Sequence, residues 1–587
     1  MVKNQKLNII YIAVFSALVI WLPVILLKLP YCRPDDDLMN FIANGSFAGN
    51  TTNLIYPNAI FGVPVSMLYG LTSAVNWFCV IYLILLSVDV FIMMWIAYKS
   101  NNKIAMICVG AIGLTLPLFL TFTVVAYMCI GAGMALAIYL SYEGKKKIVG
   151  YLIAAMLIVT GYMIRGNTAA SAIILFAPVL ILLVIESKAS VKNIAMLLAG
   201  ACLLGIVLYI CTSNPHKYRS AMMWAVLLAT AIAGLIIGMR SKLYRELILT
   251  VAVVCMAVIA VNFAENIMLD EGWKAFREYT SARSGVLDYP HARYDAVGEQ
   301  LKRAGITESG YNLLFDWSFL DKQVFSADTL KELRSIFAAN NSGIGLKKLI
   351  TDYKDITCII LPIIAAIVFG LVSNKKRRSL IGLTLVILEL IYIALVLRGR
   401  FVLRVSVPLC MIAITGMYLI SDAKWRGRNH YVPAVIAAVI CTMVVGMQYA
   451  SAIRNPERAS ESGKAVKSYV LEHSDEHFII VSKIYNDMYF AQQPAFYIKQ
   501  ERMFDNTVKS GSGDSFSPRY YDQMREWKVS DPDRLFMQLL EDDTLRYVDH
   551  NSEDMRTYLE EQSGKTVTVE IEKSFGDGLC VYKFSAD

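Results

Sequence analysis

The residues LNIIYIAVFSALVIWLPVILLKL, numbers 7–29, form an apolar run that carries no charge before Lys28. The hydrocarbon core of a bilayer is about 30 Å thick, and a helix of about 20 apolar residues crosses it. This run is therefore long enough to span a membrane. No small-residue cleavage site follows it, so we expect a retained first helix and not a removed signal peptide.

Similar apolar runs recur along the chain. Hydrophobic residues make up 56% of its 587 positions and the mean hydropathy is +0.49, which exceeds what a soluble protein of this length needs. The sequence predicts a mainly α, polytopic membrane protein with about thirteen transmembrane helices. The expected spans are residues 7–29, 75–98, 104–120, 122–141, 149–165, 168–186, 193–212, 220–239, 246–264, 356–373, 379–397, 402–420 and 431–451.

The basic residues between these spans predict the orientation of the chain. If the N-terminus is cytoplasmic, every second connection is cytoplasmic too, and these connections hold most of the loop Lys and Arg, as the positive-inside rule requires. The residues concerned are Lys3, Lys6, Lys99, Lys103, Lys145, Lys146, Lys147, Lys188, Lys192, Arg240, Lys242, Arg245, Lys375, Lys376, Arg377, Arg378, Lys424, Arg426 and Arg428. They also account for the net charge of +8 without a nucleic-acid partner. We expect a multi-pass protein of the plasma (cytoplasmic) membrane, in contact with membrane lipids and with its C-terminus outside.

Two long hydrophilic regions fall on the outer side in this orientation. The transmembrane domain is expected over residues 1–451, with outer loops at 30–74 and 265–355, and a second domain over residues 452–587. In the second domain, HFIIVSK (477–483) and TVTVEIEK (566–573) predict strands, while ESGKAVKSYVLEH (461–473) and SEDMRTYLEEQ (552–562) predict helices. The tail is therefore expected to be a small extracytoplasmic α/β domain.

Several basic residues lie on the outer side, against the positive-inside trend. They are Arg33, Arg165, His216, Lys217, Arg219, Arg398, Arg400 and Arg404. Each one alone is explained by a side chain that snorkels to the headgroups. Arg400 and Arg404 share one helical face, however, and guanidinium groups bind phosphate oxygens bidentately. These residues are therefore candidates for a phosphate site at the outer membrane surface.

Three adjacent aspartates follow the first span, in RPDDDLMN (33–40). The simplest interpretation is a solvated loop that ends the helix. Carboxylates this close repel one another, and a raised pKa, a bound cation or a neighbouring arginine would relieve the repulsion. A raised pKa suits a general base, and a bound divalent cation such as Mg or Mn suits stabilisation of a leaving phosphate. The sequence leaves open whether Asp35, Asp36 or Asp37 acts, and whether Asp36 and Asp37 hold a metal.

Two acidic residues, Asp89 and Glu389, lie within predicted spans. A charge at the centre of a bilayer costs roughly 2.5–3.5 kcal/mol on insertion scales, so both should face protein or a cavity. They could form the proton relay of a transporter, or they could be neutral and hydrogen-bonded between helices. The cysteines give no metal-site spacing, since the chain has no CxxC motif.

The aspartates and the loop behind them resemble the GT-C class of membrane glycosyltransferases, in particular uncharacterised bacterial members. The resemblance rests on DDLMNFIANGSFAGNTTNLIYPNAIFGVPVSMLYG with VNWF (36–78), and on the short segments TFTVVA (121–126), MIRGN (163–167), EYTSARSGVLDYP (278–290) and GRFVLRVSVP (399–408). In that class, an aspartate of the first outer loop acts as a general base or orients the acceptor. The donor is a polyprenyl-phosphate sugar, and the anomeric centre is inverted.

This resemblance implies that Asp36 and Asp37, with Asp35 as an additional acid, occupy the catalytic positions. It makes the outward basic residues candidates for binding the donor phosphate: Arg165, Arg398, Arg400, Arg404, Lys217 and Arg219. The acceptor would be a cell-envelope glycan, a teichoic acid or a lipid. Arg283, Asp288 and His291 are candidates for its side of the site, although surface solvation is the simpler explanation for most of them.

Two other classes of function remain open. The protein could be an ion-coupled transporter or a flippase for lipid-linked glycans, in which the aspartates bind a coupling ion; Asp89 and Glu389 favour that interpretation. The chain shows no paired halves of the kind that many transporters have, and two large outer regions are unusual for a transporter. It could also be a non-catalytic scaffold whose tail binds a partner, for which no motif speaks.

Overall fold

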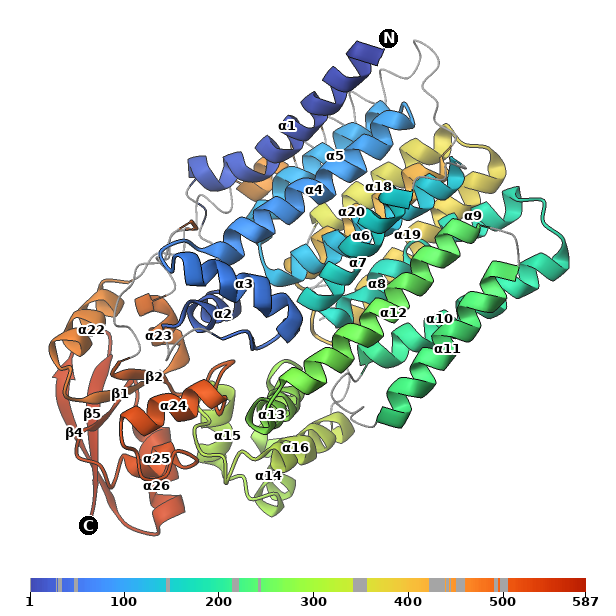
Figure 1. Ribbon diagram of the computed structural model, residues 1–587. Coiled ribbons are helices and arrows are strands. Elements are labelled where there is room, and N and C mark those ends of the chain that lie inside the picture. Colours follow the sequence, from blue (N-terminus) through green and yellow to red (C-terminus); the bar gives the residue numbers. More distant parts are fainter. Residues whose placement is uncertain are drawn as a thin grey trace.

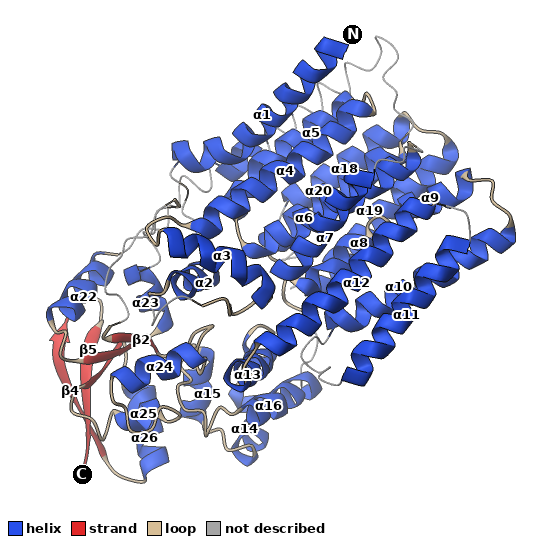
Figure 2. Ribbon diagram, viewed as in Figure 1, coloured by secondary structure: helices blue, strands red, loops and turns tan. Residues whose placement is uncertain are grey.

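The computed structural model describes residues 2–27, 29, 34–46, 51–143, 148–213, 221–240, 244–340, 356–421, 439, 443, 445–449, 460–489, 495–496 and 505–587. These residues form a long helical bundle, a group of helices at one end of it, and a C-terminal domain with a sheet (Figure 1). Helices make up nearly all of the regular structure, and the strands are confined to the C-terminal domain (Figure 2). The mainly α class predicted from the sequence is confirmed.

Eight helices of the described residues are long and apolar enough to cross a membrane. They are α1 (Val2–Leu27), α4 (Trp77–Lys99), α6 (Phe122–Tyr142), α10 (Val191–Ser213), α11 (Ala221–Arg240), α12 (Arg245–Met268), α19 (Lys375–Leu397) and α20 (Leu403–Ile420). A ninth span would be the bent pair of α7 (Ile148–Ile164) and the segment Gly166–Ile174, which contains η2 (Gly166–Thr168) and α8 (Ala169–Ile174). The chain is thus built as a multi-pass membrane protein.

Shorter apolar helices occupy three more of the expected spans. They are α5 (Lys103–Thr115) with η1 (Leu116–Phe119), α9 (Ala177–Glu186) and α18 (Ile356–Leu371). The single helix expected over 168–186 is instead two, α8 and α9, because Pro178 stands in the first turn of α9 and cannot continue a helix from α8. The span expected at 431–451 lies mostly outside the described residues, so the count of thirteen stays a prediction.

Helix α6 is the centre of the bundle. Every residue from Phe122 to Leu140 is buried, and α4, α7, α12 and α20 pack against it. Two glycines allow α6 and α7 to approach closely. A Cβ on Gly133 would lie 2.6 Å from the carbonyl oxygen of Ala154, and one on Gly161 would lie 2.6 Å from that of Ala126. Small residues at such crossings are typical of membrane helix packing.

One end of the bundle carries all the remaining elements (Figure 1). Helices α2 (Pro34–Asn44) and α3 (Ala59–Leu71) follow α1 there. Between α12 and α18 the chain forms α13 (Glu271–Leu287), α14 (Tyr294–Arg303), α15 (Glu308–Phe315) and α16 (Ala327–Asn340), which we call the outer region. The start of α1 lies at the opposite end of the bundle (Figure 1).

The C-terminal domain contains a five-stranded sheet in the order β2-β1-β3-β5-β4. Its strands are β1 (His477–Ile480), β2 (Thr507–Lys509), β3 (Leu545–Asp549), β4 (Val567–Ser574) and β5 (Cys580–Ala586). Its helices are α22 (Glu461–Glu472), α23 (Ser482–Tyr489), α24 (Pro518–Glu526), α25 (Leu535–Gln538) and α26 (Glu553–Ser563). Strands β2, β1 and β3 are parallel, and β5 and β4 extend the sheet antiparallel. The two strands and two helices predicted for this domain are confirmed.

The outer region and the C-terminal domain are joined by backbone contacts. Phe319 donates its N–H to the carbonyl of Ser510 at 2.9 Å, and Lys322 donates to that of Asp533 at 2.6 Å. The hydroxyl of Tyr558 donates to the buried carboxylate of Asp321 at 2.9 Å. In parallel α/β sheets ligands bind beyond the carboxyl ends of the strands. In this protein, residues 317–319 of the outer region lie beyond the carboxyl ends of these strands. This edge of the sheet therefore attaches the C-terminal domain to the outer region.

Candidate functional site

The three aspartates form the first turn of α2, not a loop. Pro34 stands at the first helical position, which proline favours, and the positive end of the helix dipole offsets part of the repulsion among the carboxylates. Asp36 and Asp37 are 0% and 1% exposed, whereas Asp35 is only half-buried. The three side chains therefore lie in different surroundings although they are adjacent in sequence.

Asp36 contacts the central helix of the bundle. Its Oδ1 accepts a hydrogen bond of 2.8 Å from the backbone N–H of Phe122, the first residue of α6. A carboxylate there satisfies an N–H group that has no partner within the helix and lies at the positive end of the dipole. Asp36 thus ties α2 to α6.

The other two aspartates face different neighbours. The charge of Asp37 acts on Tyr69 of α3 and on Cys79 of α4, inside the protein. Asp35 lies beside the C-terminal domain, since a Cβ on Gly513 would stand 3.7 Å from its Oδ1. It is also within electrostatic range of Tyr56. Of the three, Asp35 is the carboxylate with access to solvent.

Tyr56 connects the aspartates with the arginines. Its ring stacks on Phe122 with 5.2 Å between centroids, and the guanidinium of Arg165 lies 4.8 Å from the centroid of the same Phe122 ring. Burial raises the pKa of Tyr56 above its ordinary value, and the negative charge of Asp35 adds to this effect. The positive charges of Arg283 and Arg165 lower that pKa. The pKa of this hydroxyl thus depends on nearby charges of both signs.

A cavity of about 460 Å³ lies next to Tyr56, between the end of the bundle and the outer region. We call it the arginine cavity. Its lining residues are Ile55, Tyr56, Asn58, Tyr162, Met163, Arg165, Gly166, Asn167, Cys211, Asn262, Glu265, Arg277, Thr280, Ser281, Ser284, Gly285, Asp288, Tyr289, Arg334 and Arg400. Four of these residues are arginines and two are carboxylates. A volume of this size accommodates a small-molecule ligand.

One wall of the arginine cavity is a buried ion pair. Arg277 Nη1 lies 2.7 Å from Glu265 Oε1, and both side chains are nearly inaccessible. Glu265 also accepts hydrogen bonds from the Asn58 side chain at 2.8 Å and from the Ala59 N–H at 3.0 Å. The pair therefore fastens the segment before α3 to α12 and α13, and its charges are mutually neutralised.

A second pair lies at the junction of α19 and α20. Arg400 Nη2 is 3.1 Å from Asp288 Oδ2, and its guanidinium lies 5.3 Å from the centroid of the Tyr289 ring. Gly399 makes the turn that places Arg400 there. Its φ is +68°, and a Cβ would lie 2.4 Å from Pro290 Cγ, so only glycine fits. Both members of the pair keep some exposure, and so Arg400 can exchange its partner.

Arg165 sits where α7 ends and the chain bends by 116°. Gly166 permits the bend, because a Cβ on it would lie 2.9 Å from the Tyr162 ring. Arg165 donates hydrogen bonds to the hydroxyl of Thr123 and to Asn167. It forms no ion pair with any described residue, while Arg404 and Arg400 repel it electrostatically. Arg165 is thus a cation at the cavity wall with no counter-charge among the described residues.

Helix α13 contributes a continuous face to the cavity. Arg277, Thr280, Ser281, Ser284, Gly285 and Asp288 all line it, and their spacing of three or four residues places them on one side of the helix. Thr280 is 8% exposed, and its hydroxyl makes no hydrogen bond with any described residue. Hydroxyls on such a face suit a ligand that carries hydroxyl groups itself.

The structure brings only some of the predicted site residues together. Arg165, Arg400 and Asp288 line the arginine cavity, and Arg404 acts on Arg165. Arg398 is exposed and His291 stacks on Phe315 with 3.5 Å between ring centroids; neither lines the cavity. Lys217 and Arg219, with Arg33 and His216, lie outside the described residues.

Arg283 belongs to the contact with the C-terminal domain. It is 2% exposed, and its guanidinium donates a hydrogen bond to the carbonyl of Ser512. It also lies 5.7 Å from the ring centroid of Trp317. Although it was an acceptor-side candidate, its contacts place it under the Ser510–Ser515 turn.

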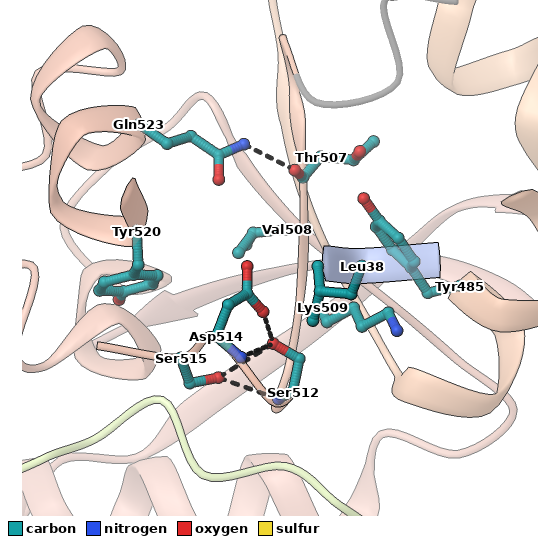
Figure 3. Close-up of a pocket in the computed structure, with 10 residues that line it drawn as sticks. All are labelled: Leu38, Tyr485, Thr507, Val508, Lys509, Ser512, Asp514, Ser515, Tyr520 and Gln523. Carbon is teal, nitrogen blue, oxygen red and sulfur yellow. Dashed lines mark hydrogen bonds between the residues drawn. The ribbon is translucent and has the colours of Figure 1, made fainter. Parts of the chain in front are cut away.

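A small polar pocket of about 20 Å³ lies above this turn (Figure 3). We call it the Lys509 pocket; its other lining residues are Leu38, Tyr485, Thr507, Val508, Ser512, Asp514, Ser515, Tyr520 and Gln523. The turn is held by hydrogen bonds that join Ser512 to Asp514 and to Ser515, as the dashed lines in Figure 3 show. The volume fits about one water molecule and excludes a larger ligand.

The charges around the Lys509 pocket come from both ends of the chain. Lys509 Nζ donates to Asn486 at 2.6 Å and lies 5.2 Å from the Tyr485 ring centroid. Burial lowers the pKa of Lys509 to about 8, and the carboxylates of Asp514 and then Asp35 act against that shift. Burial also raises the pKa of Asp514 above its ordinary value. The C-terminal domain thus places a cation near the first turn of α2.

The sequence left open whether Asp36 and Asp37 hold a metal ion. Among the residues that the structure describes, no three His, Cys, Asp or Glu side chains are placed to hold a metal ion.

Of the two intramembrane acids, Asp89 is fully buried in α4, where it interacts with Cys129 of α6, and Glu389 is half-buried on α19.

The sequence analysis did not single out several residues of this site. Tyr56, Glu265, Arg277 and Arg334 line the arginine cavity, and Lys509 approaches the aspartates from the other end of the chain. Only Glu265 could have been suspected, as an acid at the end of an apolar span. In the sequence, the other four look like ordinary residues of loops, helices or strands. They are Tyr56, Arg277, Arg334 and Lys509.

No protein-family model, no curated protein and no solved structure matches this chain. The function has to be argued from the residues of the site.

Proposed function

We propose that this protein is a membrane glycosyltransferase. It would transfer a sugar from a polyprenyl-phosphate donor to an extracytoplasmic acceptor such as a cell-envelope glycan, with inversion of the anomeric centre. Its site would be the arginine cavity together with Asp35. The sequence resemblance suggested this class, and the geometry of the cavity is compatible with it.

The observation that carries the proposal is Arg165. Within the part of the chain that the structure describes, it is a guanidinium without a counter-charge, at the wall of a cavity of about 460 Å³ and at the end of a bundle of apolar helices. A lipid-linked phosphate lies at that level when its chain is in the bilayer. Binding it would supply the missing negative charge, and guanidinium–phosphate pairs are among the strong charge-assisted hydrogen bonds.

Arg400 would be the second phosphate ligand. Its partner Asp288 is a half-exposed carboxylate at 3.1 Å, and a phosphate can replace that carboxylate with little change in the position of the guanidinium. Arg404 adds positive charge nearby. Arg398 is left out of the donor site because it does not line the cavity.

Asp35 would be the general base. Asp36 is engaged by the N-terminus of α6, and Asp37 faces α3 and α4 in the interior. Asp35 keeps access to solvent and acts on Tyr56, which lines the cavity. An acceptor hydroxyl that enters beside Tyr56 would be within reach of this carboxylate.

The reaction balances with these groups alone. The acceptor hydroxyl gives its proton to Asp35, and its oxygen forms a bond to the anomeric carbon. The bond between that carbon and the phosphate oxygen breaks, and polyprenyl phosphate leaves with the electron pair. Arg165 and Arg400 stabilise the charge that develops on the departing phosphate, which is commonly the larger contribution to catalysis.

Transfer assays with substituted aspartates test this assignment. Full-length protein in proteoliposomes would receive a radiolabelled polyprenyl-phosphate sugar and a crude cell-envelope acceptor. Asp35→Asn should lower the initial rate about 100-fold or more, because a general base contributes about 10²–10⁴-fold. Asp36→Asn should change the rate by less than about tenfold, since the amide oxygen still accepts from Phe122. Full transfer by Asp35→Asn would overturn the proposal.

The alternative of an ion-coupled transporter or flippase keeps one supporting observation, the fully buried Asp89 in α4. If the aspartate carries a coupling proton, Asp89→Asn should abolish proton-driven movement of a fluorescent lipid-linked sugar across the same liposomes. Under the glycosyltransferase proposal, this variant keeps the transfer rate of the wild type. The two outcomes are measured on one preparation and separate the two functions.

A further inference from the structure

We propose that Arg334 forms a second anion subsite, at the face of the arginine cavity built by the outer region. It would bind an oxyanion, a phosphate or carboxylate, of the acceptor, so that the acceptor is an anionic polymer and not a neutral glycan. The identification of the bound anion as part of the acceptor rests on the proposed function. The subsite itself rests on the geometry of α13 and α16.

The first support is the placement of Arg334. It is an exposed residue of α16, yet its side chain lines the cavity because it lies along α13 at Gly285. A Cβ on Gly285 would come within 3.0 Å of Arg334 Cδ and 3.3 Å of its Nη1. The absence of a side chain at position 285 thus lets the guanidinium lie against the helix that lines the cavity.

The second support is the charge balance of the cavity. Arg277 is paired with Glu265, and Arg400 with Asp288. Arg165 and Arg334 are the two lining cations that form no ion pair with a described residue. Arg165 belongs to the bundle and Arg334 to the outer region, so the two excess charges stand on walls made by different parts of the chain. One donor phosphate satisfies the first charge and leaves the second for another anion.

The third support is the hydroxyl of Thr280. Thr280 lines the cavity and is only 8% exposed, and its buried hydroxyl oxygen makes no hydrogen bond with any described residue. A buried polar atom without a partner is costly unless a ligand or water satisfies it. Thr280, Ser281 and Ser284 lie on the same face of α13 as Gly285, where Arg334 rests. The face therefore offers hydroxyls next to a cation, as a polyol phosphate or an acidic sugar requires.

Binding of a defined probe tests the subsite without any transfer reaction. The full-length protein would be placed in nanodiscs of phosphatidylcholine alone, and a short poly(glycerol phosphate) chain would be titrated by calorimetry. Arg334→Gln should weaken binding about tenfold, which corresponds to about 1.4 kcal/mol. Arg334→Lys should restore part of the affinity, and Thr280→Val should weaken binding by a smaller factor. Arg303→Gln, an exposed arginine of α14 outside the cavity, is the matched control and should bind as the wild type does.

The outcomes separate this inference from the proposed function. Wild-type affinity in Arg334→Gln would overturn the subsite, whatever the transfer assay shows. Nanodiscs that contain phosphatidylglycerol test whether the bound anion is a lipid headgroup. If that lipid displaces the probe from the wild type but not from Arg334→Gln, the anion is a headgroup and the acceptor assignment is wrong. Probe binding that depends on Arg334, in a protein without transfer activity, would overturn only the glycosyltransferase.

Discussion

The arginine cavity and the Lys509 pocket lie at the same end of the bundle and contain the same kinds of groups, yet they differ in room and in charge balance. The cavity has about 460 Å³ and two arginines without an ionic partner among the described residues. The pocket has about 20 Å³, and its cation lies within electrostatic range of the carboxylates of Asp514, Asp35 and Asp37. Clustered charges alone therefore do not make a binding site.

This difference assigns separate roles to charged residues that look alike in the sequence. The cavity has room for a ligand, and an anionic ligand would balance its excess positive charge. In the pocket, the chain supplies both signs itself, so no ligand is needed to balance the charge. Substitutions in the cavity should change ligand binding and transfer, whereas those at paired groups should change stability.

The largest effect is expected at the paired wall of the cavity. Glu265→Gln leaves Arg277 buried without its counter-ion, and breaking one side of a buried pair costs about 3–5 kcal/mol of unfolding free energy. The thermal midpoint in detergent, followed by intrinsic fluorescence, should fall clearly. Glu299→Gln, at an exposed ion pair of α14, should leave the midpoint unchanged. An unchanged midpoint for Glu265→Gln would mean that this wall is not structural.

Next in size is the titration of Lys509. Its pKa of about 8 lies below its ordinary value of 10.5, so between these two pH values the unfolded chain binds a proton that the folded protein does not. Wild-type stability should therefore rise, relative to Lys509→Met, by about 3 kcal/mol as the pH increases from 8 to 10.5. Thermal midpoints of both proteins across this range measure it. A constant difference between them would contradict the burial of a charged Lys509.

The arginine cavity should respond in activity instead. Arg165→Gln removes the cation that is proposed to hold the donor phosphate, and the transfer rate should fall about 100-fold. Its thermal midpoint should stay near that of the wild type, because no described residue loses an ionic partner. Arg398→Gln is the matched control and should transfer normally. If Lys509→Met lost as much activity as Arg165→Gln, the distinction between the two sites would be wrong.

The smallest effect is expected for the contact between α2 and α6. Asp36→Ala removes the carboxylate that accepts from the N–H of Phe122, and should lower the unfolding free energy by about 1 kcal/mol. Asp36→Asn keeps an acceptor oxygen and should cost less. Thermal midpoints of the two variants, measured side by side, test the order. A larger loss for the asparagine would contradict the contact.

The sequence predicted much of the fold because each span is a local property. Twelve of the thirteen expected spans coincide with one or two helices, since apolar runs fix where helices enter and leave a membrane. It also named three cavity residues: Arg165 and Arg400 as outward basic residues against the positive-inside trend, and Asp288 as an acceptor-side candidate in the long outer loop. It missed Arg334, because nothing near that residue differs from an ordinary surface helix.

The sequence by itself determined the apolar spans, and two of the strands and two of the helices of the C-terminal domain. These depend on residues a few positions apart. Only the tertiary structure decided which aspartate keeps access to solvent, which arginines have no counter-ion among the described residues, and where there is room for a ligand. The contacts responsible join distant residues: Asn58 and Glu265 are 207 positions apart, and Arg283 and Ser512 are 229 apart. Counter-charges and cavity volume arise from such long-range packing, which local patterns do not encode.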